Sequence, residues 1–233
     1  MTIRQITLRL VAIAALAAVA LTAGPASAQI RITEVMSSSL STGDWFELTN
    51  VSGSVVNLQN YYWDDNGPTG NDGALFPSID VQPGESIVIV DAADAAAVTS
   101  FVSNWLGGFT AYGSYEFAGP DTFSGLSSNG DQIELWDADP NTNPSANLIA
   151  NVSFPAATQG FTFAWAETGA DLGVSVSGQN LAFTATNLDV GSPGLAVVPE
   201  PSSIVLVGFA GLGLVGSIAR RRFGRKAAAT AAA

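Results

Sequence analysis

Two glutamates are the residues of this 233-residue chain whose types and positions best suit catalysis. Glu34 and Glu47 lie in consecutive short apolar segments, so they can pair as carboxylates. A glycosidase needs two carboxyl groups at a defined separation. In the alternative interpretation, Glu34 makes a structural hydrogen bond and Glu47 sits at a strand edge. We favour this structural alternative, because the chain lacks the other groups that catalysis commonly uses.

Histidine and cysteine are both absent from the chain. Histidine is the most frequent general base and the commonest zinc ligand, so its absence argues against an ordinary catalytic triad and against typical zinc sites. No Gly-x-Ser-x-Gly elbow or phosphate-binding loop is present. We therefore expect a protein that is not an enzyme and that needs no cofactor, with calcium as the one metal to weigh.

Two Asp- and Asn-rich stretches offer the oxygen ligands that calcium prefers. The first alternates acidic and amide residues: Asp137, Asp139, Asn141 and Asn143. The second is Gly-rich and contains Asp64, Asp65 and Asp72. The first stretch departs from a calcium loop, since Thr142 stands where the loop needs glycine and Leu148 where it needs a bidentate Glu. Solvated turn residues are the favoured interpretation, and calcium binding is the alternative.

The charge of the chain is concentrated in its middle. Between Ile30 and Val198 there are 19 acidic residues and a single basic one, Arg31, which gives a formal charge of −18. A field of this sign repels nucleic acid and anionic polymers, and it favours divalent cations or basic partners. We expect no nucleic-acid partner.

Short alternating segments separated by Gly, Pro, Asn and Asp predict an all-β domain with the spacing of a sandwich. The expected strands cover 30–36, 45–48, 55–58, 61–63, 86–90, 132–136, 148–154 and 161–165, with a late hairpin at 174–176 and 181–183. The segment Ser86–Val90 is continuously apolar after its serine, so it is expected to be buried on both faces. About 165 residues suffice for one domain with its own core.

One helix is expected to interrupt the strands. Asp91 can cap a segment that runs to Leu106 with apolar residues at helical spacing, and Gly107–Gly108 ends it. We interpret this helix as a short crossover over one end of the sandwich. Trp45 and Phe46 must point to opposite faces of their strand, so one is expected to fill the core and the other to lie under a loop.

The N-terminal segment 1–28 has the features of a secretory signal peptide. Arg4 and Arg9 precede an apolar stretch, and Ala26 and Ala28 form a cleavage site before Gln29. The segment predicts passage through the Sec translocon, removal by signal peptidase, and an exported mature protein.

The C-terminal segment 196–233 combines a proline-rich break, an apolar stretch and a basic cluster. The break is Val198, Pro199, Glu200 and Pro201, and the cluster begins with Arg220, Arg221 and Arg222 and extends to 226. The apolar stretch, 203–219, is nearly long enough to cross a bilayer as a transmembrane helix, and the positive-inside rule keeps the cluster in the cytoplasm. The prolines hold Glu200 in an extended, accessible conformation. These features fit either a processed sorting signal or a permanent anchor.

The order of these three C-terminal features resembles the PEP-CTERM sorting signal. This resemblance, over about 197–226, implies recognition near Pro199–Pro201 by an exosortase, an integral-membrane cysteine protease or transpeptidase. The signal is typical of exopolysaccharide-producing Gram-negative bacteria. It implies an inner-membrane intermediate that is then delivered to the cell surface or the extracellular matrix.

Four motifs of the middle region resemble a lamin-tail domain, in the right order, and the first of them consists of three short stretches. They are Ile32–Val35 with Asp44–Asn50 and Val56–Tyr61, then Val81–Val90, then Asn129–Leu135, and finally Gly191–Gly194. The resemblance covers about 29–195 and implies an immunoglobulin-like β-sandwich that serves as a binding or structural module. The Gly- and Asp-rich segment 66–74 and the long segment 107–130 depart from the family pattern.

Taken together, these features predict an exported, exosortase-sorted protein of the cell surface or matrix. Its β-sandwich would be non-catalytic and would bind exopolysaccharide or surface proteins. One alternative is an extracellular polysaccharide hydrolase that uses carboxylates. The other is a periplasmic structural protein that stays anchored in the membrane.

Overall fold

The computed structural model describes residues 29–65, 67, 73–118, 123 and 125–197. All of the secondary structure described belongs to one compact unit, residues 1–196. The predicted signal peptide and the predicted transmembrane helix 203–219 lie outside the described residues. Within the described part, no helix combines the length and apolarity that a membrane crossing requires.

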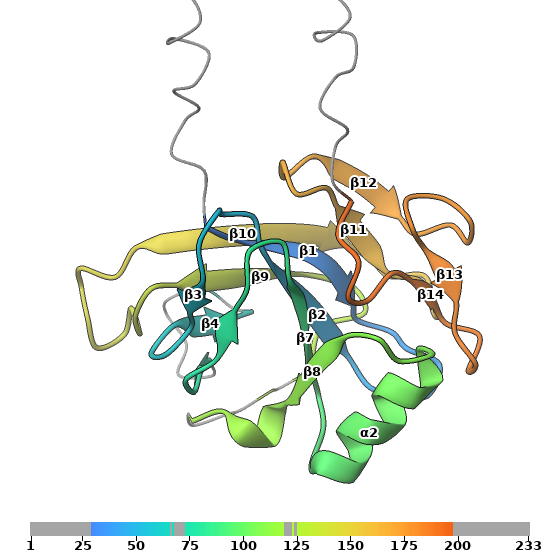
Figure 1. Cartoon of the computed structure of the whole chain (residues 1–233), viewed down its shortest axis with the longest axis horizontal. Helices are drawn as coiled ribbons and strands as arrows, with labels where there is room; N and C mark the ends of the chain where they lie inside the picture. The colour runs from blue at the N-terminus through green and yellow to red at the C-terminus, as the bar shows by residue number, and fades with distance from the viewer. Residues whose placement is uncertain (1–28, 66, 68–72, 119–122, 124, 198–233) are drawn as a thin grey trace, which may run out of the picture. The chain divides into compact units, whose positions relative to one another are not determined.

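The larger sheet has six strands in the order β12-β11-β1-β2-β7-β8 (Figure 1). Its members are β1 (Ile30–Met36), β2 (Trp45–Asn50), β7 (Ser86–Val90), β8 (Thr110–Gly113), β11 (Phe163–Trp165) and β12 (Asp171–Val174). All neighbours run antiparallel except β7 and β8, which are parallel. A parallel pair requires a crossover connection, and the helix supplies it.

The smaller sheet has four strands in the order β10-β9-β4-β5. They are β10 (Leu148–Pro155), β9 (Gly130–Trp136), β4 (Tyr62–Asp64) and β5 (Ala74–Leu75). Two short pairs complete the β-structure: β3 (Val56–Asn57) with β6 (Asp80–Val81), and β13 (Phe183–Thr184) with β14 (Val190–Gly191). A single turn of 3₁₀-helix, η1 (Ser114–Glu116), follows β8.

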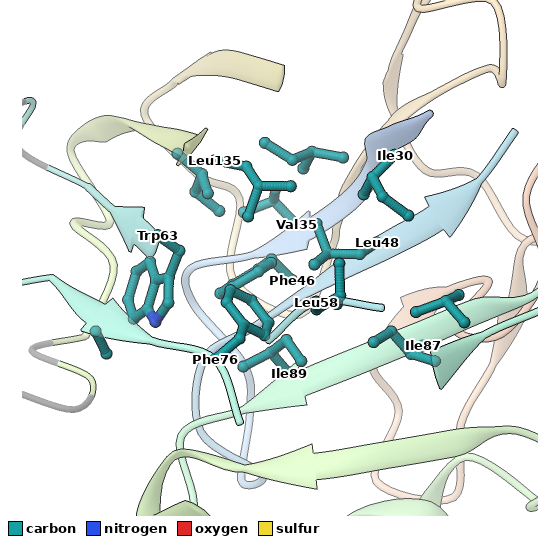
Figure 2. Close-up of a cluster of buried hydrophobic side chains, with 14 of the residues drawn as sticks. Ile30, Val35, Phe46, Leu48, Leu58, Trp63, Phe76, Ile87, Ile89 and Leu135 are labelled. Carbon is teal, nitrogen blue, oxygen red and sulfur yellow. The ribbon is translucent and has the colours of Figure 1, made fainter. Parts of the chain in front are cut away.

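The main core is built from side chains of both sheets (Figure 2). Phe46 of β2 packs on Trp63 of β4, with ring centroids 5.1 Å apart, and Phe123 lies 4.9 Å from Trp63. Alternate residues of β1, β2 and β7 point into this core because side chains on a strand alternate between faces. The core residues of those three strands are Ile30, Ile32, Val35, Phe46, Leu48, Ile87 and Ile89.

A second apolar cluster covers the opposite face of the six-stranded sheet. The helix α2 (Ala95–Asn104) places Phe101 and the following Trp105 over Trp45, together with Met36, Val88, Val90, Ala92 and Ala185. Strand β7 therefore contacts apolar side chains on both faces, and all five of its residues are buried, as its sequence predicted. Phe46 fills the main core, as predicted for one of the two residues. Trp45 lies under the helix, so the expectation that it would lie under a loop is wrong.

The prediction of a mostly β domain with one crossover helix is confirmed. Two details of it are wrong. The helix is capped by Asp94, whose carboxylate accepts a 2.9 Å bond from the Ala97 backbone N–H, so Asp91 is not the cap. The expected late hairpin does not form, since β12 pairs with β11 and β13 pairs with β14. Alternation identifies a strand without identifying its partner.

Candidate functional site

Glu34 and Glu47 lie directly opposite each other on β1 and β2. The register shifts between Ile32 and Glu34, which is the mark of a β-bulge, so Thr33 and Glu34 together oppose Glu47. Both glutamates are only 1% exposed. They occupy the face of the sheet opposite the main core. The expectation that Glu47 sits at a strand edge is wrong, because β2 lies in the interior of its sheet between β1 and β7.

The oxygen atoms of both carboxyl groups are engaged by groups of the protein itself. Glu34 accepts hydrogen bonds from Thr162 Oγ1 at 2.5 Å and from the Ser192 N–H at 2.8 Å, and its other oxygen lies 3.1 Å from Ser192 Oγ. Glu47 accepts from Thr33 Oγ1 at 2.6 Å and from the Gly194 N–H at 2.5 Å. Two of these donors are backbone groups of residues 190–195, which we call the closing segment.

Glycine allows the closing segment to approach the sheet this closely. A Cβ at Gly191 would stand 2.8 Å from Glu34 Oε1, and a Cβ at Gly194 would collide with the Phe109 side chain. Gly194 also has φ +82°, a conformation that other residues rarely adopt. The Gly191–Gly194 segment therefore brings two backbone N–H groups onto the buried carboxyls.

Burial raises the pKa of both carboxyl groups. The pKa of Glu34 rises to about 8, chiefly through loss of hydration and further through the charge of Glu47. The pKa of Glu47 rises to about 7, again chiefly through burial, although its bonds from Thr33 and Gly194 act in the opposite direction. Near neutral pH the pair therefore shares at least one proton.

A carboxyl pair with raised pKa values has the chemistry of a general acid and base. Here the closing segment lies over the pair. The structure has a pocket of about 320 Å³ lined by Arg31, and neither glutamate lines it. The arrangement instead fastens residues 190–195 to the six-stranded sheet. Glu34 thus makes the structural hydrogen bond expected in the non-catalytic interpretation.

Hydroxyl groups extend this buried polar network, and the sequence interpretation missed them. Thr49 Oγ1 lies 2.8 Å from Thr33 Oγ1 and 2.7 Å from Ser86 Oγ, and Thr162 Oγ1 lies 2.6 Å from Ser175 Oγ. One signal was present locally, because Glu47 and Thr49 are two residues apart and must share a face. Thr162 and Ser192 had no such signal, since they are distant from Glu34 in the chain.

The first candidate calcium stretch forms a loop after β9 in which Asp137, Asp139 and Asn143 accept hydrogen bonds from the loop itself. Asp137 accepts from the Asn147 backbone and side-chain N–H groups at 2.7 and 2.8 Å, which lower its pKa. Asp139 accepts from the Asn141 N–H and from Thr142 Oγ1. Asn143 Oδ1 accepts from the Ser145 N–H. The Asn141 side chain instead donates to Tyr62 Oη at 3.3 Å, outside the loop. Three of the four predicted ligands therefore stabilise the loop conformation directly.

The second candidate stretch is only partly described. Asp64 at the end of β4 is 0% exposed and Asp65 is 5% exposed, whereas Asp72 lies outside the described residues. Among the residues that the structure describes, no group of three or more Asp, Glu, His or Cys side chains is placed to hold a metal ion.

Calcium binding by these loops stays a prediction, and thermal melting tests it. If either loop binds calcium, millimolar calcium is expected to raise the melting temperature relative to excess chelator, because a ligand that binds only the folded state stabilises it. Asp139→Asn serves as the variant, since it removes one charged ligand and retains an oxygen. Identical melting curves in calcium and chelator would reject calcium binding.

The predicted processing sites fall mostly outside the described residues. These are Ala26 and Ala28 at the N-terminal cleavage site, and Val198, Pro199, Glu200, Pro201, Arg220, Arg221 and Arg222 at the C-terminal signal. Gln29, the predicted first residue of the mature protein, is described and exposed. Its carbonyl accepts a 2.9 Å bond from the Val51 N–H, which places the start of the domain beside the end of β2.

Comparison with protein families identifies two matching regions. The model of the Lamin Tail Domain family matches residues 23–155, more than half of the chain. The model of the PEP-CTERM protein-sorting motif matches residues 197–225. The first match includes both glutamates of the buried pair, and the second includes the proline-rich break and most of the basic cluster.

Comparison with individual proteins gives one distant structural similarity. No curated protein matches the chain. Among solved structures, a DUF4876 family protein from Bacteroides thetaiotaomicron is similar at 13% identity and a TM-score of 0.38, covering 76% of this chain and 74% of its own.

Proposed function

The chain belongs to the lamin tail domain family, and from this premise we propose that it is a non-catalytic binding or structural module of the cell surface or extracellular matrix. The PEP-CTERM motif at 197–225 implies export and processing by an exosortase. In the route that we propose, the signal peptide 1–28 directs export through the Sec translocon. The segment 203–219 then holds the protein in the inner membrane until an exosortase acts near Pro199–Pro201.

The observation that supports a non-catalytic role is the covering of the Glu34–Glu47 pair. A hydrolase would need these carboxyls to reach a glycosidic oxygen and a water molecule. Instead, both side chains are 1% exposed and accept bonds from the closing segment. The pair therefore stabilises the fold by holding the closing segment on the sheet. Binding would then use the exposed loops and sheet edges.

The high negative charge supports a surface role in a second way. The segment between Ile30 and Val198 has a formal charge of −18, which favours solubility outside the cell and disfavours association with nucleic acid. On the ground of the sorting motif, the partners that we propose are exopolysaccharide or other surface proteins. The ions that balance the charge would be divalent cations of the medium.

The sorting route is tested by changing Pro199, Glu200 and Pro201 together to alanine in the native host. We expect the unchanged protein to reach the surface fraction without its 202–233 tail, and the variant to remain in the inner membrane with the tail intact. Mass spectrometry of the C-terminal peptide in each cell fraction measures both outcomes.

Glu167→Ala is the matched control, because it removes the same charge from the turn after β11 without touching the motif. A surface protein that keeps its intact tail would support the permanent anchor and contradict exosortase processing. Full-length protein in the cytoplasm would contradict export itself.

A further inference from the structure

A pocket of about 320 Å³ lies between strands β1 and β10. Strand β1 pairs with β11 only through Glu34 and Val35, so its first half has no partner strand on the side away from β2. Strand β10 is the end strand of the smaller sheet, and it lies beside β1 (Figure 1). The sandwich is therefore open at this corner. Residues that line the opening include Arg31, Asn151, Val152, Ser153, Trp165 and Gly169.

Arg31 gives this pocket its chemical character. It is the only Arg or Lys between Ile30 and Val198. Its side chain is half-buried, and its Nε is buried without a hydrogen-bond partner among the described residues. A donor that is removed from water and left unpaired is unfavourable unless something accepts its hydrogen bond. The Arg31 side chain thus lines the pocket, and its guanidinium group has one buried donor without a partner among the described residues.

The turn after β11 is shaped around this guanidinium. Gly169 has φ +84°, and a Cβ at this position would stand 2.8 Å from Arg31 Nη1. A larger residue would push the guanidinium aside. Trp165, the last residue of β11 before this turn, is 8% exposed and lines the pocket with an apolar side chain.

We propose that this pocket binds the carboxylate of an acidic sugar residue, such as a hexuronate. The planar fork of arginine matches a carboxylate and can donate two parallel hydrogen bonds to it. Asn151 and Ser153 are exposed on β10 and offer amide and hydroxyl groups for sugar hydroxyls. Trp165, Ile32 and Val152 supply apolar surface for the carbon face of the ring.

The size of the pocket favours a sugar ring over a peptide strand. A volume of about 320 Å³ corresponds to roughly ten water molecules and lies at the small end of the range of ligand sites. The turn at Gly169 and the Trp165 side chain form one of its walls. A single acidic ring fits this space, whereas an added strand would need an open groove along β10.

The charge of the surrounding domain makes this site selective. With 19 acidic residues and one basic residue between Ile30 and Val198, non-specific adsorption of an anion is disfavoured. Long-range repulsion is screened beyond about 8 Å at physiological salt, whereas a direct contact with Arg31 is not. Within residues 30–198, the Arg31 pocket is therefore the place where the carboxylate of an acidic glycan meets a basic side chain. That the acidic sugar belongs to a surface glycan rests on the proposed function. That the pocket binds a sugar carboxylate does not depend on it.

Ligand-observed NMR titration of the full chain, solubilised in non-ionic detergent at 150 mM salt, tests the proposal. The probes are methyl glucuronoside, methyl glucoside and acetate. We expect the glucuronoside to bind at least tenfold more tightly than either of the others, because only it presents both the carboxylate and the ring. This result does not depend on sorting in cells, so failure here and failure of the proposed function are distinguishable.

Arg31→Gln is expected to weaken glucuronoside binding roughly 10- to 100-fold, the equivalent of a lost charge-assisted hydrogen-bonded pair. Asn151→Asp places a negative charge on the exposed strand at the pocket and is expected to weaken binding similarly without disturbing the fold. Gln179→Glu is the control, since it adds the same charge at an exposed turn outside the pocket and is expected to leave the affinity unchanged.

Three results would overturn the proposal. The first is a glucuronoside affinity no higher than that of the glucoside. The second is acetate binding as tightly as the glucuronoside, which would leave only a carboxylate site without sugar recognition. The third is equal weakening by Asn151→Asp and Gln179→Glu, which would assign the effect to net charge.

Discussion

Replacing Trp45 by alanine is expected to lower the free energy of unfolding by about 3–5 kcal/mol. The side chain is 0% exposed and its ring makes edge contacts with two aromatic side chains of the helical region. The centroids lie 5.8 Å from Phe101 and 5.6 Å from Trp105. The loss combines the burial of a large ring with the cavity left behind. Urea unfolding followed by circular dichroism measures it.

The effect is large because the helix depends on this contact. A helix of ten residues is marginal in water by itself, so α2 stays folded through its packing on the sheet. Trp45→Phe keeps most of the apolar ring and removes an indole N–H that has no partner among the described residues, so its cost should be near 1 kcal/mol. Val55→Ala, at a side chain that is 50% exposed, is the control and should change stability by less than about 0.5 kcal/mol. A Trp45→Ala variant as stable as this control would contradict the second cluster.

For Trp45 and Phe46, the sequence predicted how the two side chains lie relative to each other on their strand. Their adjacency in a strand required opposite faces, and the structure confirms that Phe46 fills the main core. Alternation could not say what covers Trp45, because that depends on where α2 packs. The continuous apolar segment 86–90 did contain this information, since a strand buried on both faces needs a cover on each.

The buried polar network was harder to predict. Glu34 meets Ser192 across 158 residues and Thr162 across 128 residues of sequence. Local periodicity carries no information about such distant partners, and β13 and β14, with two residues each, are too short to show any period. The sequence showed only that Arg31 is the single basic residue of the middle region. Its position in a pocket followed from the unpaired edges of β1 and β10, which only the assembled sheets reveal.

The stability of the domain is expected to fall as the pH rises from about 5 to 8. The pKa of Glu34 is raised from an ordinary 4.5 to about 8 and that of Glu47 from 4.5 to about 7. In this window the folded state holds protons that the unfolded chain has released. The free energy of unfolding therefore decreases with pH. The stabilising contribution of the pair is complete below about pH 4.5 and is lost as the pH passes the raised pKa values.

The expected loss is at least about 3 kcal/mol, because one pKa unit corresponds to about 1.4 kcal/mol and the rise of the Glu47 pKa from 4.5 to about 7 accounts for that much by itself. For a domain of this size, that corresponds to a fall of roughly 6–12 °C in melting temperature. Calorimetry at pH 5, 6, 7 and 8 with constant ionic strength measures it. Exposed carboxylates titrate mainly below pH 5, so the chosen window isolates buried groups.

Glu34→Gln removes the titration of Glu34 and retains its contacts, while Glu47 still titrates. The amide oxygen can accept from Thr162 and from the Ser192 N–H, and the amide nitrogen can donate to Ser192 Oγ. This variant is expected to reduce the pH dependence to the part that Glu47 contributes and to be more stable than the unchanged protein at pH 8. Glu167→Gln in the turn after β11 should leave the slope unchanged. Burial also raises the pKa of Asp44, so a slope that survives in Glu34→Gln and disappears in Asp44→Asn would assign the effect to that carboxyl and contradict the role of the pair.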